Sequence, residues 1–241
     1  MSNHIATSEK KRICLLNCEN HPNWIKYNLD IHDDNFLIEC YNVFEYKWPL
    51  KTELESFDAF LITGSLSAAY ETEELVKNTW VPSFGSFVQE LVQTVLTNNQ
   101  TNSRKQYILG ICFGHQIIAH YCGGEGHKMT TPQYGIQPQT IKQEFFTTFL
   151  FDFSTIFIFL SFFTIFFRFF ELNYVKEALD QLKVKYSSEV SALLDHRATF
   201  APIETHGDEV LRMPTGATLL TTSENTPVES YAIGNYVLCL C

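Results

Sequence analysis

The sequence is short of basic residues and lacks the glycine-rich motifs that bind phosphate groups. Its 241 residues hold 17 Lys and Arg against 27 Asp and Glu, which gives a net charge of −10. This balance offers no cationic surface for a phosphate backbone, so nucleic acid is excluded as an expected partner. No phosphate loop or dinucleotide fingerprint occurs, and a nucleotide-dependent synthetase step would therefore have to come from another chain.

A disulfide framework and a secretion signal are also missing. The seven cysteines form an odd set without framework spacing, and the segment MSNHIATSEKKR lacks the apolar stretch of a secretory signal. We therefore expect a reducing, cytoplasmic setting. The Cys14/Cys18 and Cys239/Cys241 pairs have no companion ligands in the sequence, so neither a metal site nor a cofactor is expected.

Short apolar runs alternate with helical patterns in the first half of the chain. The runs at 12–16, 36–41, 57–64 and 106–112 are nearly continuous, as expected for strands covered on both faces. Between the last two runs, a helix is predicted from apolar residues at helical spacing, namely Phe84, Phe87, Leu91 and Val95. The order strand, helix, strand predicts an α/β fold with a mostly parallel central sheet flanked by helices, in one domain over residues 1–241.

Three more strands are predicted near the end of the sequence, in ATLLTTS, VESYAI and YVLCLC. Gly234 and Asn235 lie between the last two, and two residues of this type favour a tight hairpin turn.

The segment GICFGHQ, residues 110–116, places a cysteine between two glycines where a strand is predicted to turn into a helix. Ligands of parallel α/β folds bind beyond the carboxyl ends of the strands, where Gly64 and Cys112 both fall. A cysteine on such an elbow gains thiolate character from the helix start, and the N–H of Phe113 can face a developing oxyanion. A second backbone donor is expected from Gly64 or Ser65. The alternative is a small buried cysteine at a tight turn.

GICFGHQ resembles the nucleophile motif GxCxGxQ of the class I glutamine amidotransferases, a family that includes stand-alone gamma-glutamyl peptidases. FDAFLITGS, IIAHYCGGEG and THGDEV through AIGN resemble further family blocks in the same order. The resemblance implies a flavodoxin-like fold and attack by Cys112 on a gamma-glutamyl amide, with a thioester intermediate. It also implies that Gln116 and His206 line the glutamyl pocket. Free glutamine and a gamma-glutamyl peptide are both open as the substrate, and a separate synthase subunit is a possible partner.

One departure from the family concerns the general base. Family members take their base and its carboxylate from a His-Pro-Glu motif after the strand that YVLCLC resembles, whereas this sequence ends at Cys241. We therefore expect a C-terminally truncated domain with impaired hydrolysis. His206, with Asp208 two residues later, is a weaker candidate for a substitute base. A non-catalytic domain that binds a glutamyl ligand is the main alternative function.

The second departure is a phenylalanine-rich segment over residues 144–172. It is interrupted by Asp152 and Arg168, and a bilayer span there would put the two halves of one domain on opposite sides of a membrane. A membrane-anchored protein is therefore the weakest alternative. We expect an insertion that is foreign to the fold and prone to aggregation where it is exposed.

Overall fold

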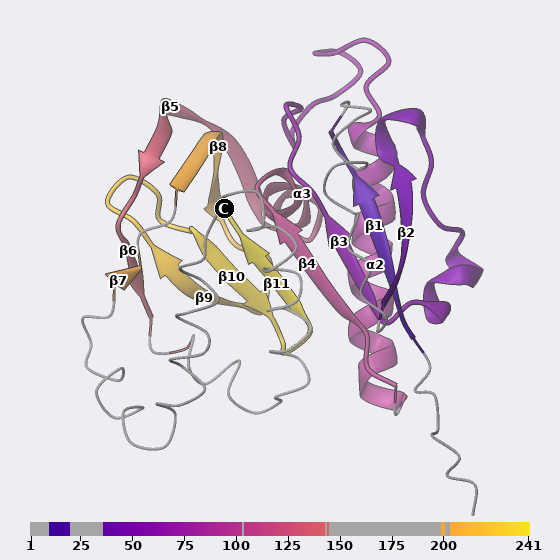
Figure 1. Ribbon diagram of the computed structural model, residues 1–241. Coiled ribbons are helices and arrows are strands. Elements are labelled where there is room, and N and C mark those ends of the chain that lie inside the picture. The colour runs from indigo at the N-terminus through magenta and orange to yellow at the C-terminus, as the bar shows by residue number, and fades with distance from the viewer. Residues whose placement is uncertain (1–9, 20–35, 103, 143, 145–198, 201–202) are drawn as a thin grey trace, which may run out of the picture.

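The computed structural model describes residues 10–19, 36–102, 104–142, 144, 199–200 and 203–241 (Figure 1). Its main element is a nine-stranded sheet in the order β2-β1-β3-β4-β11-β10-β9-β6-β7, and a second sheet pairs β5 with β8. The strands are β1 (Lys11–Asn17), β2 (Phe36–Asn42), β3 (Ala59–Ile62), β4 (Tyr107–Ile111), β5 (Glu125–Ile136), β6 (Gln139–Ile141), β7 (Thr199–Phe200), β8 (Ile203–Arg212), β9 (Ala217–Thr222), β10 (Ser230–Ile233) and β11 (Val237–Leu240). The helices are η1 (Val43–Glu45), η2 (Lys51–Ser56), α2 (Val81–Thr101) and α3 (Phe113–Tyr121).

The parallel part of the main sheet comprises β2, β1, β3, β4 and β11. Its central strands are apolar in consecutive positions because both of their faces are covered; all four residues of β3 are buried. One face packs on α2 and α3 through Phe60, Ile62 and Ile108. The predicted α/β class and parallel core are therefore confirmed, and the four remaining strands extend this core in antiparallel fashion.

Helix α2 confirms the spacing seen in the sequence, because Phe84, Leu91 and Val95 are fully buried and Phe87 lies at the edge of the same core. Helix α3 follows β4 directly and ends at Cys122, where Gly123 adopts a left-handed φ of 91°. Glycine reaches this conformation without a side-chain clash and so terminates the helix.

The last two strands form the predicted hairpin, but the predicted two-residue turn is wrong. Ile233 pairs with Val237, so the connection contains three residues. Gly234 takes a left-handed φ of 55°, and the carbonyl of Tyr236 accepts a hydrogen bond from the Ile108 N–H at 2.8 Å. Tyr236 is therefore held by β4 instead of continuing the β10–β11 ladder.

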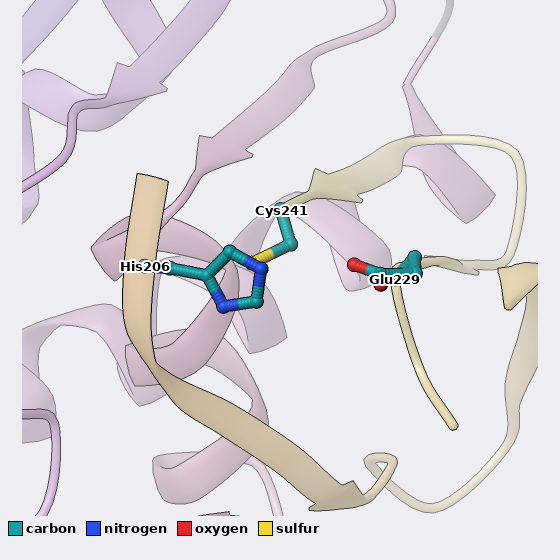
Figure 2. Close-up of side chains that lie close together, drawn as sticks. All are labelled: His206, Glu229 and Cys241. Carbon is teal, nitrogen blue, oxygen red and sulfur yellow. The ribbon is translucent and has the colours of Figure 1, made fainter. Parts of the chain in front are cut away.

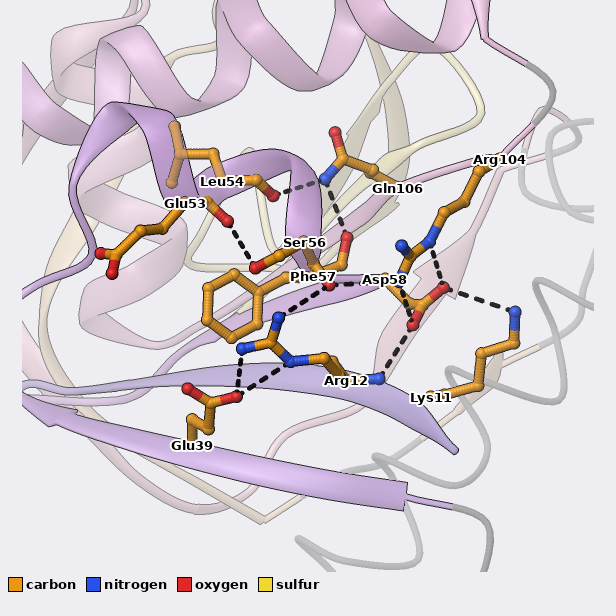
Figure 3. A network of polar contacts seen from close by, with 10 residues as sticks. All are labelled: Lys11, Arg12, Glu39, Glu53, Leu54, Ser56, Phe57, Asp58, Arg104 and Gln106. Atoms are coloured by element: carbon orange, nitrogen blue, oxygen red, sulfur yellow. Dashed lines mark hydrogen bonds and ion pairs between the residues drawn. The ribbon is translucent and has the colours of Figure 1, made fainter. Parts of the chain in front are cut away.

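Asp58 ties together the amino ends of three neighbouring strands (Figure 3). Its carboxylate accepts hydrogen bonds from the Arg12 N–H at 2.8 Å and from two nitrogens of Arg104 at 2.9 and 2.8 Å. The Asp58 side chain is only 5% exposed, and Lys11 adds a longer ion pair at 3.4 Å. Because β1, β3 and β4 are fixed at this end, their opposite ends are held in register where the candidate site lies.

Two predictions concern residues 145–172, which lie outside the described residues, namely the foreign character of the segment 144–172 and its exclusion from a bilayer. The single-domain boundary over 1–241 stays a prediction as well. Within the described part of the chain, no helix has both the length and the apolar character needed to cross a membrane.

Candidate functional site

Cys112 occupies the turn between β4 and α3, with backbone angles φ 51° and ψ −105°. A positive φ is uncommon for a residue with a side chain, and it marks a strained turn of the kind that exposes a nucleophile. The turn is fixed on both sides, since the Cys112 N–H donates to the Leu240 carbonyl at 2.8 Å and its carbonyl accepts from the Gln116 N–H at 3.1 Å. The predicted elbow is therefore present in the backbone.

The two glycines beside the cysteine are required by close packing. A Cβ on Gly114 would lie 2.4 Å from the carbonyl oxygen of Ile62, and one on Gly110 would lie 2.8 Å from the backbone of Gly114. Both distances are shorter than a carbon atom tolerates. The start of α3 thus sits directly against the end of β3, and only glycine allows this approach.

The electrostatic surroundings of Cys112 differ from the expectation. Burial raises the pKa of its thiol to about 11; the backbone N–H of Phe113 opposes this shift, while the carboxylates of Glu19 and Asp208 add to it. The helix start therefore acts in the expected direction but is outweighed. Burial and the two carboxylates, which the sequence pattern did not indicate, therefore determine the net direction of the shift in the thiol pKa.

The three residues proposed as oxyanion donors lie around the cysteine. The N–H of Phe113 is hydrogen-bonded toward the Cys112 sulfur. A Cβ built on Gly64 would lie 3.7 Å from that of Cys112, so the end of β3 is adjacent to the nucleophile position. Ser65 follows in a turn in which its hydroxyl accepts from the Ser67 N–H at 3.1 Å. The geometry brings these backbones together, and their role stays a prediction.

Gln116 and His206 converge on one carbonyl group. The Gln116 Nε2 donates to the Asp208 carbonyl at 3.1 Å, and the His206 Nδ1 lies 3.0 Å from the same oxygen. Gln116 is 3% exposed and His206 is 5% exposed. Gln116 therefore joins α3 to β8, and His206 contacts the same carbonyl from within β8.

The side chain of Asp208 is turned to a different partner, which corrects the idea of a His206–Asp208 base. Its Oδ1 accepts from the Tyr70 hydroxyl at 2.7 Å, while the contact of His206 with this residue is to the backbone carbonyl. Residues two apart in a strand share a face, but the Asp208 carboxylate is hydrogen-bonded to Tyr70, which lies in the segment after β3. This carboxylate lies close enough to Cys112 to raise the pKa of its thiol.

His115, next to the elbow, is a core residue. It is fully buried, its ring centroid lies 5.0 Å from that of Tyr231, and the Tyr231 hydroxyl donates to its backbone carbonyl at 2.8 Å. Burial first, and then the charge of His206, lower the pKa of His115 to about 3. The imidazole is therefore neutral at physiological pH.

Sequence reasoning missed Glu19, Tyr70 and Glu229 near the site, and it found no companion ligands for Cys241. Glu19 follows the carboxyl end of β1, so the rule that ligands bind at this edge could have identified it. Glu229 is fully buried, and its carboxylate lies with His206 and Cys241 in one cluster. No local sequence spacing indicates this cluster, because its members come from three separate strands or their ends.

The chain is similar to a known protein family. Residues 41–232 match the family described as Glutamine amidotransferase class-I. The chain is 26% identical to gamma-glutamyl peptidase 3 of Arabidopsis thaliana over 84% of its own length and 60% of that protein. It is also 26% identical to one subunit of the glutamine-hydrolysing GMP synthase of Sulfolobus acidocaldarius, over 60% of its length and 53% of that protein. The chain thus spans no more than three-fifths of either relative.

A crystal structure of a glutamine amidotransferase from Thermotoga maritima superposes with a TM-score of 0.58, covering 96% of this chain and 75% of that one at 14% identity. At this identity the likeness concerns the fold alone. The family match, in contrast, covers most of the sequence, including both the elbow and β8. The chain therefore belongs to the class I glutamine amidotransferase family.

Proposed function

We propose that this protein hydrolyses gamma-glutamyl amide bonds, with Cys112 as the nucleophile. The observation that carries the proposal is the strained elbow, where Cys112 has a φ of 51° between β4 and the start of α3. In the reaction the Cys112 sulfur bonds to the amide carbon, its proton is removed by a base, and the amine leaves with a proton. Water then cleaves the thioester, releasing a glutamyl acid and restoring the thiol.

The oxyanion of each tetrahedral intermediate is proposed to bind the Phe113 N–H together with a backbone N–H at Gly64 or Ser65. Phe113 already points its N–H toward the sulfur, and Gly64 is adjacent to the cysteine. One such donor contributes on the order of 3 kcal/mol to lowering the barrier. These donors belong to the backbone at the ends of β3 and β4, so they are positioned before the substrate binds.

The two carboxylates near Cys112 favour the binding of a cationic group of the substrate. Glu19 and Asp208 both act on the Cys112 thiol, and Tyr70 holds the Asp208 carboxylate in place. A gamma-glutamyl substrate carries an ammonium group beyond its side chain, and we assign this group to the space beside these carboxylates. The similarity to gamma-glutamyl peptidase 3 over 84% of the chain favours a gamma-glutamyl peptide over free glutamine.

The raised thiol pKa makes a base necessary. With a pKa of about 11, only about one Cys112 in ten thousand is a thiolate at pH 7. The 241 residues contain no His-Pro-Glu motif. We therefore propose that a polypeptide of these residues alone is acylated slowly and turns over poorly. The raised pKa of the Cys112 thiol also favours a second candidate function, a domain that binds a glutamyl ligand without hydrolysing it. The protein is proposed to act in the cytoplasm.

The nucleophile is tested with a diazoketone analogue of glutamine, followed by peptide mapping by mass spectrometry. We expect covalent label on Cys112 ahead of the other six cysteines, and protection by a gamma-glutamyl dipeptide. Cys40→Ser is the matched control, because Cys40 is an exposed thiol on a strand distant from the elbow. Equal labelling of all seven cysteines, without protection, would contradict the proposal.

The need for a base is tested by extension. Adding a family-like tail with His-Pro-Glu after Cys241 should raise gamma-glutamyl dipeptide hydrolysis by roughly 10²- to 10⁴-fold, the usual contribution of a positioned acid–base group. His206→Ala in the unextended chain is the control. If the unextended chain turns over at an ordinary enzyme rate and this substitution abolishes it, His206 is the base. If the extended chain binds the dipeptide but never hydrolyses it, the binding-domain alternative holds.

A further inference from the structure

Three side chains with metal-binding atoms meet at the junction of the two sheets. His206 comes from β8, Glu229 directly precedes β10, and Cys241 directly follows β11. Their ligand atoms all lie within 4.8 Å of one another. Figure 2 shows the imidazole and the Glu229 carboxylate on either side of the Cys241 sulfur.

The backbones that carry these side chains are fixed by the main sheet. The Cys241 N–H donates to the Glu229 carbonyl at 2.8 Å, and the Glu229 N–H donates to the Thr221 carbonyl at 3.1 Å. Donor atoms around a tetrahedral zinc ion lie about 3.5 Å apart, as follows from Zn–N and Zn–S bonds of about 2.0–2.3 Å. The ligand atoms, which lie within 4.8 Å of one another, would have to move closer together by side-chain rotation to bind an ion.

The imidazole of His206 already has the orientation of a metal ligand. Its Nδ1 lies 3.0 Å from the Asp208 carbonyl, and a carbonyl can only accept, so Nδ1 carries the proton. Nε2 then carries the lone pair, and in Figure 2 the nitrogen farther from the main chain faces the Cys241 sulfur. A histidine that donates from one nitrogen to a backbone carbonyl and binds a metal through the other is the usual arrangement in metal sites.

We propose that His206, Glu229 and Cys241 bind a zinc ion, with water in the fourth position. The donor set combines a thiolate, a neutral imidazole and a carboxylate, which suits Zn²⁺ and does not suit Ca²⁺ or Mg²⁺, since these ions bind oxygen ligands. The two anionic donors balance the charge of the ion, which matters because Glu229 is fully buried and His206 is 5% exposed. The nucleophile Cys112 is not one of the three ligands, so the proposal does not depend on hydrolysis.

A zinc ion at this position would link the two sheets. It would join β8 of the small sheet to β10 and β11 of the main sheet, and β11 in turn holds Cys112 through the Leu240 carbonyl. Zinc is therefore expected to stabilise the contact between the two sheets beside the elbow, and to raise the unfolding temperature of a protein that contains these 241 residues.

The test is zinc binding to the metal-stripped protein, measured by competition with a chromophoric chelator. We expect one zinc ion per chain, and Cys241→Ser and Glu229→Gln should each raise the Kd at least tenfold. Cobalt, used as a spectroscopic substitute, should give a thiolate-to-metal absorption band in the near ultraviolet that Cys241→Ser removes. Cys40→Ser and His127→Ala, which change an exposed thiol and an exposed imidazole elsewhere, should leave both readouts unchanged.

Three results would overturn the proposal. The first is a wild-type protein without stoichiometric zinc or without the cobalt–thiolate band, a measurement that needs no variant to fold. The second is an unchanged Kd in both ligand variants. The third is loss of the metal in Cys112→Ser with retention in Cys241→Ser, which would assign the metal to the nucleophile. Labelling of Cys112 by the glutamine analogue is scored separately, so either proposal can fail while the other holds.

Discussion

Gly114→Ala tests whether the close approach of α3 to β3 holds the elbow in shape. The added Cβ would lie 2.4 Å from the Ile62 carbonyl oxygen and 3.1 Å from the Ile62 Cβ, so the helix start must move away from the strand. Overpacking of this kind costs typically 1–3 kcal/mol. Alanine recovers up to about 1 kcal/mol through its better helix propensity. After the full recovery, we expect a net loss of up to about 2 kcal/mol in the free energy of unfolding, which is up to about 8 °C in Tm for a chain of this size.

The assay is urea unfolding followed by circular dichroism, together with the rate at which the diazoketone analogue labels Cys112. Labelling should slow in Gly114→Ala, because the moved helix start takes the Phe113 N–H away from the sulfur. Gly207→Ala is the matched control, since a Cβ there meets nothing within 4 Å and the change should stay within about 0.5 kcal/mol. If Gly114→Ala unfolds and labels like Gly207→Ala, the packing argument for the elbow is refuted.

Cys112, His115 and Asp58 give three more predictions from their surroundings. Because the pKa of Cys112 is raised to about 11, its alkylation by iodoacetamide should accelerate about tenfold per pH unit up to that value. Asp208→Asn should shift this pH profile to lower pH, because it removes a carboxylate that raises the thiol pKa. A plateau of the alkylation rate near pH 8 in the unsubstituted protein would contradict this prediction. The pKa of His115 is lowered to about 3, so unfolded chains take up its proton first as the pH falls below about 6.5. Stability should drop by about 1.4 kcal/mol per unit until pH 3, and His115→Leu should remove that slope in urea titrations. Asp58→Asn should cost about 1–3 kcal/mol of unfolding free energy, since it removes the charged acceptor that Arg104 uses; an unchanged urea midpoint would argue against the network.

The sequence was sufficient to predict the parallel core, because its strands are covered on both faces and therefore consist of continuous apolar runs. The elbow could also be predicted, since Gly110 and Gly114 reflect a close backbone approach that any fold with this turn requires. The length of the last hairpin turn was predicted wrongly. The Tyr236 carbonyl accepts a hydrogen bond from Ile108 of β4, and this is a tertiary contact. Turn residues alone carry no information about such a contact.

The electrostatics of the site could not be predicted from the elbow motif. The pKa of a thiol depends on every group packed around it, and the two carboxylates that act on Cys112 come from the end of β1 and from β8. The cluster of His206, Glu229 and Cys241 could not be predicted from the sequence for the same reason. Each of its members lies on a different strand or strand end, and only the order of the strands in the sheets brings them together.

The strand register explains why a base-bearing segment after Cys241 would act on this nucleophile. Strand β11 runs parallel to β4, with Leu240 paired to Ile111, so Cys241 and Cys112 leave the sheet at the same edge and in the same direction. The Leu240 carbonyl already accepts from the Cys112 N–H at 2.8 Å. A histidine placed shortly after β11 therefore starts beside the thiol that needs it, without any contribution from distant parts of the chain. The nucleophile is positioned by the β4–α3 turn and by its contacts with β3 and β11, whereas proton removal depends on a base that follows β11 at the same edge of the sheet.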